Sequence, residues 1–153
     1  MMNRRRFTLT ALMAAVAPAG LRAETFEVTR TDAQCRAMLT DLQYQVMRHE
    51  ATELAGTSPL DKIYAAGTYL CRGCDLPLYD SAAKFDSGTG WPSFYQSLPY
   101  AIGTKEDNTL FSTRTEAHCR RCGSHLGHIF DDGPAPTGKR HCLNGASLVF
   151  IAA

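Results

Sequence analysis

Two Cys-x-x-Cys motifs constrain the fold of this chain more than any other feature of its sequence. The motifs are Cys71–Cys74 and Cys119–Cys122, and 44 residues lie between them. A glycine lies within the first motif and directly after the second, which suits tight turns. Paired motifs of this kind are the usual way to supply four thiolate ligands to one zinc ion. The sequence therefore predicts one structural zinc ion per chain, held by Cys71, Cys74, Cys119 and Cys122.

Three other uses of these cysteines compete with zinc. Two disulfides are the main alternative, because an oxidising compartment favours them. A thioredoxin-like redox pair would need a βαβ context, which neither motif has. Haem attachment would need a histidine directly after the second cysteine, where the chain has Asp75 and Gly123. The match between the two motifs favours zinc.

The first 23 residues have the layout of a bacterial export signal. Arg4-Arg5-Arg6-Phe7 resembles a twin-arginine signal, although Asn3 occupies a position that usually holds Ser or Thr. The apolar run at 8–16 is too short for a permanent membrane anchor. Small residues follow, with possible cleavage after Ala19 or Ala23. We expect an exported, periplasmic protein whose mature domain is residues 24–153; the alternative is a poorly ordered start without a targeting role.

The charge of the mature chain gives no indication of a nucleic-acid partner. Removal of residues 1–23 takes away four of the 16 basic residues and none of the 15 acidic ones, which leaves a net charge of about −3. Nucleic-acid binding needs a basic footprint instead. At this length we expect one domain, and we expect it to be a monomer.

The pattern of residues after the signal predicts a mainly β domain with small N-terminal helices. The segments 31–34 and 40–43 fit the capping-box pattern, so each predicts the start of a short helix. Residues 51–68 predict an irregular loop. After it, short apolar or aromatic runs alternate with Gly, Pro and Asp, which is typical of antiparallel strands. The expected strands are 68–70, 76–79, 109–113, 126–130 and 148–151.

Cys142 is the candidate reactive thiol. It lies in Arg140-His141-Cys142-Leu143-Asn144, and side chains on a strand alternate between faces. Arg140, Cys142 and Asn144 would then share one face. A guanidinium beside the sulfur would favour the thiolate and lower its pKa. The alternative is a buried structural cysteine.

Several other residues are candidates for the same site. His125 and His128 could donate hydrogen bonds or protons to a substrate oxygen, although they could also ligate metal or lie on the surface. Trp91, in a loop framed by Gly and Pro, could form a flat apolar wall for a substrate or could be a core residue. Asp131 and Asp132 lie in a turn, where one carboxylate could orient a histidine.

These motifs together closely resemble the methionine-R-sulfoxide reductases, the B-type enzymes, over residues 28–151. The matching segments are Cys71-x-x-Cys74, 84–94 (KFDSGTGWPSF), Cys119-x-x-Cys122, 125–134 (HLGHIFDDGP) and 140–144 (RHCLN). The resemblance implies two antiparallel sheets in an open barrel or sandwich-like core, with a structural zinc ion away from the active site. It also implies an enzyme that repairs oxidised methionine.

The resemblance also implies roles for particular residues. Cys142 would attack the sulfoxide sulfur and become a sulfenic acid, and Arg140 would stabilise its thiolate. The sulfoxide oxygen would be bound or protonated by His125, His128 and Asn144. Trp91 would pack on the substrate methyl group, and Phe130 and Asp132 would support the site.

The chain departs from the family pattern at Thr89. Many members have a resolving cysteine there, and threonine cannot form a disulfide. Because some members place that cysteine near the N-terminus, Cys35 is the candidate resolving residue, and a thioredoxin-like protein is the expected reductant. The alternative is that Cys35 only packs within the first helix. The substrates would be oxidised proteins or free methionine sulfoxide.

Two rival functions follow from the same residues. A non-catalytic, zinc-ribbon-like binding module explains the four cysteines but not the Trp91 loop, the histidines or Cys142. A thiol oxidoreductase acting on disulfides would need two neighbouring redox cysteines.

Overall fold

The computed structural model describes residues 24–110 and 112–153. The expected export signal, residues 1–23, lies outside the described residues. Within the described ranges, no helix has the length and apolar character needed to cross a bilayer.

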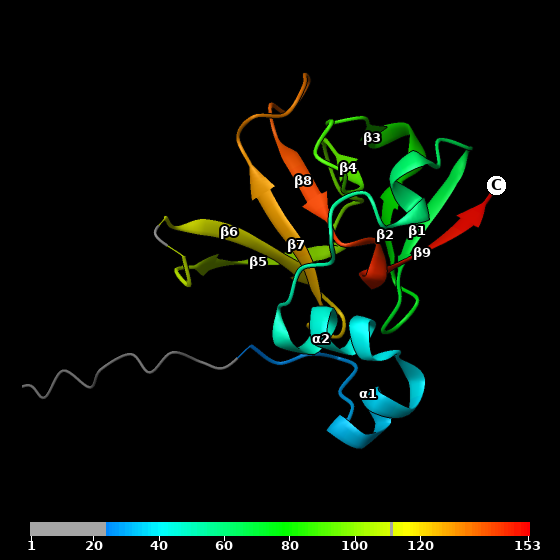
Figure 1. The fold of residues 1–153 in the computed structure, drawn as a ribbon, viewed down its shortest axis with the longest axis vertical. Coiled ribbons are helices and arrows are strands. Elements are labelled where there is room, and N and C mark those ends of the chain that lie inside the picture. The colour runs from blue at the N-terminus through cyan, green and yellow to red at the C-terminus, as the bar shows by residue number, and fades with distance from the viewer. Residues whose placement is uncertain (1–23, 111) are drawn as a thin grey trace, which may run out of the picture.

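Two short helices open the described chain, and both begin where the sequence predicts. The helices α1 (Asp32–Met38) and α2 (Asp41–His49) start after Thr31 and Thr40. In each case the threonine hydroxyl accepts a hydrogen bond from the backbone N–H three residues later, and a glutamine there accepts one in return. These reciprocal bonds satisfy N–H groups that a helix start otherwise leaves free. Both helices lie at one end of the β domain (Figure 1).

Most of the described chain after α2 forms two open antiparallel sheets, and the 3-10 turns after β2 and after β8 connect one sheet to the other (Figure 1). The first has the order β2-β1-β9, with β1 (Gly67–Cys71), β2 (Pro77–Asp80) and β9 (Leu148–Ala152). The second has the order β3-β4-β8-β7-β6-β5, with β3 (Lys84–Phe85), β4 (Ser93–Phe94), β5 (Ile102–Asp107), β6 (Arg114–Cys119), β7 (His125–Phe130) and β8 (Arg140–Leu143). The turns are η1 (Pro59–Lys62), η2 (Ser81–Ala83) and η3 (Gly145–Ser147). The predicted mainly β fold is confirmed.

Three buried aromatic rings join the two sheets. Tyr69 on β1 and Tyr79 on β2 pack on Phe94 of β4, with ring centroids 4.9 and 4.6 Å apart. All three side chains are fully buried. Burial of each ring is worth about 1.5–3 kcal/mol, so this cluster fixes how β4 and its neighbours sit against β1 and β2.

The expected strand at 109–113 is wrong, and its neighbour β5 was not predicted. The described residues of 109–113 form the connection between β5 and β6. Asp107 shapes that connection, because Oδ1 accepts hydrogen bonds from the backbone N–H and the hydroxyl of Thr109. Three successive residues of β5, Thr104 to Glu106, are exposed. An exposed strand of this kind lacks the apolar alternation by which strands are predicted.

Candidate active site and metal centre

Four neighbouring strands bring a row of polar residues together. Cys142 on β8 pairs with Ser93 on β4 and with His128 on β7, and His128 pairs with Glu116 on β6. Residues directly opposite one another in antiparallel strands project to the same face. Sheet register alone therefore places the Cys142 sulfur beside the His128 imidazole.

The alternation predicted for this segment is confirmed from Arg140 to Leu143, whereas Asn144 lies beyond the end of β8 and is buried. His141 and Leu143 are buried, whereas Arg140 and Cys142 are half-buried. The buried His141 is bound through Nδ1 to the hydroxyl of Tyr79 at 3.0 Å, and burial lowers the pKa of His141 to about 4. Cys142 is therefore turned towards accessible space rather than into the core.

Cys142 lines a pocket of about 150 Å³. Five residues singled out in the sequence meet there: Trp91, His128, Phe130, Cys142 and Asn144. Thr52, Arg114, Gly127 and Leu143 complete the lining. Cys142 is the only cysteine among the described residues that line it, so the structure does not supply the neighbouring pair that a disulfide oxidoreductase needs.

Gly127 lets β7 and β8 close against each other beside this pocket. A Cβ atom at position 127 would lie 2.0 Å from the carbonyl oxygen of Cys142. Any larger residue would therefore force apart the two strands that carry His128 and Cys142.

Asp132 and Phe130 hold Arg140 in place. The Asp132 carboxylate accepts two hydrogen bonds from the guanidinium, both at 2.9 Å, and these hold the pKa of Asp132 below its usual range. The guanidinium carbon lies 4.4 Å from the centre of the Phe130 ring. Neither Asp131 nor Asp132 contacts a histidine among the described residues, so Asp132 orients the arginine instead.

The surroundings of Cys142 favour its thiol form over the thiolate. Burial raises its pKa, and the Thr89 hydroxyl and the Arg140 guanidinium oppose that effect only in part. The expectation that Arg140 lowers the pKa is right in direction, but desolvation is the larger effect. Thr89 Oγ1 lies 3.9 Å from the Cys142 sulfur and is itself bonded to the Ser87 hydroxyl at 2.8 Å.

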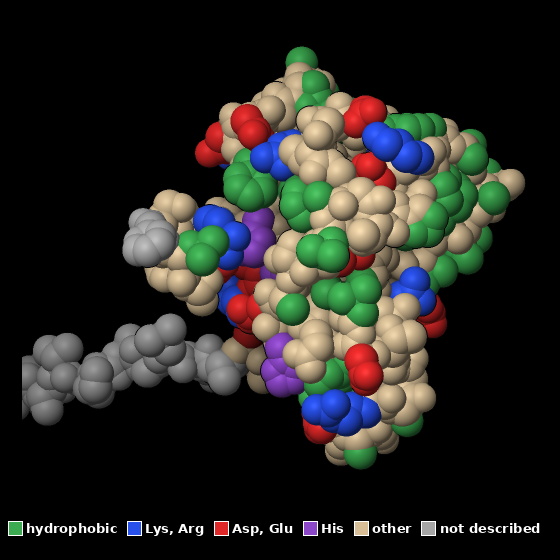
Figure 2. Space-filling model, in the orientation of Figure 1, with side chains coloured by type: hydrophobic (Ala, Val, Ile, Leu, Met, Phe, Trp, Pro, Cys, Tyr) green, Lys and Arg blue, Asp and Glu red, His purple; other side chains and the backbone are tan. Residues whose placement is uncertain are grey.

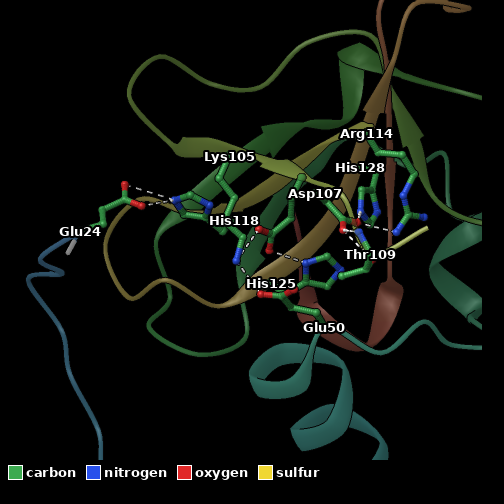
Figure 3. A network of polar contacts seen from close by, with 10 residues as sticks. Glu24, Glu50, Lys105, Asp107, Thr109, Arg114, His118, His125 and His128 are labelled. Carbon is green, nitrogen blue, oxygen red and sulfur yellow. Dashed lines mark hydrogen bonds and ion pairs between the residues drawn. The ribbon is translucent and has the colours of Figure 1, made fainter. Parts of the chain in front are cut away.

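His128 is paired with a carboxylate that the sequence pattern does not single out. Its Nε2 lies 2.7 Å from Oδ2 of Asp107, at the end of β5 (Figure 3). Burial lowers the pKa of His128, and the hydrogen bond to Asp107 acts in the opposite direction. Histidine side chains show in the hollow between the β5–β6 hairpin and the rest of the molecule (Figure 2).

His125 lies outside the pocket. Its Nδ1 contacts Oε1 of Glu116 at 2.6 Å, and the other Glu116 oxygen lies 3.0 Å from the Lys105 ammonium (Figure 3). The two imidazoles of His125 and His128 meet edge to face, with centroids 5.4 Å apart. His125 instead lines a separate cavity of about 380 Å³ beside α2. The structure therefore places His125 in contact with His128 but not in the lining of the Cys142 pocket.

Asn144 ties the loop that contains Glu53 to strand β7 beside the pocket. Its Oδ1 accepts a hydrogen bond from the backbone N–H of Glu53, and its Nδ2 donates to the carbonyl of Leu126. The Glu53 carbonyl accepts from the Trp91 indole N–H at 3.1 Å. The Glu53 carboxylate accepts from the backbone of Gly145 and Ala146, and burial raises its pKa. Asn144 thus positions Trp91 as well as lining the pocket.

The four predicted metal ligands form one cluster. The sulfurs of Cys71, Cys74, Cys119 and Cys122 all lie within 4.8 Å of one another. Two contacts between the motifs measure 3.6 Å, for Cys71 with Cys122, and 3.5 Å, for Cys74 with Cys119. Tetrahedral zinc with Zn–S bonds of about 2.3 Å spaces its sulfurs by about 3.8 Å. The thiols are unbridged, so the donor set and spacing fit one metal ion.

Cys35 is buried on α1, beside the cysteine cluster rather than the pocket. It lines a small cavity together with Cys122, Gly73 and Ser124. In Figure 1, α1 is well separated from β8. The structure does not bring Cys35 and Cys142 together.

A cysteine that lines a pocket, an imidazole with its own carboxylate and a fixed arginine define a thiol-dependent oxidoreductase rather than a binding module. Comparison with known proteins specifies the family. The SelR domain model matches residues 39–152. The peptide methionine sulfoxide reductase MsrB of Thiobacillus denitrificans is 53% identical over 122 residues, covering 79% of this chain and 92% of that protein.

Two further relatives extend the match. The protein of the same name from Leptospira interrogans is 45% identical, covering 82% of this chain and 96% of its own length. The chloroplastic peptide methionine sulfoxide reductase B1 of Oryza sativa subsp. japonica is 48% identical, covering 80% of this chain and 58% of that protein. The chain belongs to the SelR-domain family, the methionine-R-sulfoxide reductases.

Proposed function

We propose that this protein reduces methionine R-sulfoxide to methionine by direct attack of the Cys142 sulfur on the sulfoxide sulfur. The observation that supports this chemistry best is the meeting of Cys142, His128 and Trp91 in one pocket of a SelR-domain chain. A sulfoxide needs a nucleophile for its sulfur and a proton for its oxygen, and the paired strands β7 and β8 supply both groups.

The proposed step balances in atoms and electrons. The Cys142 thiolate attacks the substrate sulfur while the imidazolium of His128 gives a proton to the oxygen. The attack forms a bond between the two sulfurs. The protonated oxygen then moves from the substrate sulfur to the Cys142 sulfur, the S–S bond and the S–O bond of the substrate break, and Cys142 is left as a sulfenic acid. Methionine sulfur is reduced, and cysteine sulfur is oxidised. Arg140, held by Asp132, stabilises the thiolate once substrate has bound.

The substrate class follows from the pocket and from the relatives. The indole of Trp91 offers a flat apolar wall to a methyl group, and the relatives are named as peptide methionine sulfoxide reductases. Comparison of kcat/KM for the R and S epimers, each in a peptide and as the free amino acid, tests this assignment. A preference for the S epimer would contradict it.

The four-cysteine cluster is proposed to hold one structural zinc ion. Zinc there would supply folding free energy rather than chemistry, because the cluster is separate from the residues that line the Cys142 pocket.

The reductive half-reaction is proposed to use an external thiol, with a thioredoxin-like protein as the physiological reductant. Two thiol groups then convert the sulfenic acid back to the thiol, with one disulfide and one water as products. The Cys35–Cys142 disulfide expected from the sequence stays a prediction, and it requires α1 to unpack from its place. The burial of Cys35 favours its alternative role in packing.

Replacement of Cys35 by serine tests these two routes. We expect Cys35→Ser to keep its multiple-turnover rate with thioredoxin within about twofold, because the sulfenic acid can be attacked through the pocket. Mass spectrometry after sulfoxide treatment without reductant should find the sulfenic acid on wild-type Cys142. Loss of multiple turnover with thioredoxin in the variant, together with a Cys35–Cys142 disulfide in the wild type, would show that Cys35 is the resolving cysteine.

Export to the periplasm is proposed from the basic and apolar pattern of residues 1–23. Mass spectrometry of the periplasmic fraction should find a mature chain that begins at Glu24. Replacement of both Arg4 and Arg5 by lysine should leave the precursor in the cytoplasm if the twin-arginine route is used. Size-exclusion chromatography of the mature chain should give a monomer.

A further inference from the structure

Asp107 is surrounded by hydrogen-bond donors (Figure 3). Its Oδ1 accepts from the hydroxyl and the backbone N–H of Thr109, at 2.6 and 2.9 Å. Its Oδ2 accepts from the Arg114 guanidinium at 2.5 Å and contacts Nε2 of His128 at 2.7 Å. These contacts, the Thr109 hydroxyl first among them, hold the pKa of Asp107 well below its usual range. The carboxylate is therefore ionised.

The ionised carboxylate decides which nitrogen of His128 bears the proton. A carboxylate without a proton can only accept, so Nε2 of His128 must be the donor in their contact. Neutral His128 is then the Nε2–H tautomer. Its Nδ1 makes no hydrogen bond with any described residue, and it is the nitrogen that gains the second proton.

We propose that Asp107 is a positioning residue for sulfoxide reduction: it fixes His128 as the Nε2–H tautomer and stabilises the imidazolium that donates its Nδ1 proton to the sulfoxide oxygen. The inference rests on the proposed function, because it takes His128 as the proton donor. In the step, the Nδ1 proton moves to the oxygen, the Cys142 thiolate attacks the sulfur, and His128 returns to its neutral form.

The other groups around His128 do not replace Asp107 in this role. Arg114 and the neighbouring His125 disfavour a positive charge on His128, as does burial. Glu116 is already paired with His125 and Lys105. The charged and titratable groups that face His128 are Asp107 on β5, Arg114 and Glu116 on β6, His125 on β7 and Cys142 on β8.

The tautomer is measured directly in the wild-type protein. Nitrogen-15 NMR of histidine-labelled protein, with the His128 signals assigned through His128→Asn, should show Nε2 protonated and Nδ1 free at a pH above the imidazole titration. A wild-type spectrum with the proton on Nδ1 would overturn the role of Asp107, whether or not any variant folds.

Asp107→Asn tests the stabilisation of the imidazolium. Loss of the negative charge should lower the pKa of His128 by about one pH unit or more. Because His128 has a lowered pKa and Cys142 a raised one, the acid limb of the pH profile of kcat/KM reports His128. That limb should move to lower pH, and the plateau should fall roughly tenfold for each pH unit by which the limb moves.

Asp131→Asn is the matched control, because Asp131 is exposed and, among the described residues, pairs only with Lys139. We expect its pH profile to coincide with that of the wild type. A lower plateau in Asp107→Asn without movement of the acid limb or of the His128 titration would show a merely structural role and overturn the proposal. A wild-type rate in His128→Asn would instead remove the proton-donor assignment on which the inference rests.

Discussion

Cys142→Ser is expected to abolish sulfoxide reduction, with a loss on the order of 10³-fold or more. A serine hydroxyl is almost wholly un-ionised at neutral pH, and oxygen is a far weaker nucleophile than a thiolate toward sulfur. The pocket should survive the change, because Cys142 is half-buried and its neighbours are held by their own contacts. Single-turnover methionine formation, measured with peptide R-sulfoxide and no reductant, tests this.

Cys35→Ser is the matched control for that experiment. It makes the same chemical change at a buried cysteine outside the pocket. Under either account of the reductive step it should form one methionine per chain at the wild-type rate. Substantial turnover in Cys142→Ser would show that another residue is the nucleophile.

Cys119→Ser is expected to lose the metal and most of the stability of the domain. Zinc binding by a four-thiolate site contributes about 10–16 kcal/mol of apparent free energy in small zinc domains. The whole stability of a domain is about 5–15 kcal/mol, so loss of one ligand is sufficient to unfold much of the population. Metal analysis should give one zinc per chain in the wild type, and thermal denaturation should show the transition lost or greatly lowered in the variant.

Cys35→Ser also serves as the control for the metal site. It should retain one zinc per chain and lose much less stability than Cys119→Ser, although Cys35 is buried and lies beside Cys122. Isolation of active, metal-free wild-type protein with Cys71–Cys74 and Cys119–Cys122 disulfides would contradict the zinc assignment.

The parts of the site that depend on local sequence could be predicted. Alternation on a strand placed Arg140 and Cys142 on one face, and the spacing of the cysteines gave the four members of the cluster. The helix starts at Thr31 and Thr40 followed from capping chemistry, which involves residues only three positions apart.

The parts that depend on strand neighbours could not be predicted. Asp107 lies in a charged strand with no apolar alternation, and its contact with His128 arises only when β5, β6 and β7 are assembled. The same is true of Glu116, whose carboxylate is bonded to Nδ1 of His125. The two histidines look equivalent in sequence, and only the register of β7 against β6 and β8 distinguishes them.

The cysteine cluster lies where the two sheets meet, since Cys71 ends β1 in one sheet and Cys119 ends β6 in the other. A metal ion there would act as a joint between the two halves of the domain. Oxidation of Cys142 is a normal step that a thiol reverses, whereas oxidation of one ligand would open this joint. Under prolonged oxidation, this enzyme would then be inactivated by loss of the metal and unfolding of the domain rather than by loss of the Cys142 thiol.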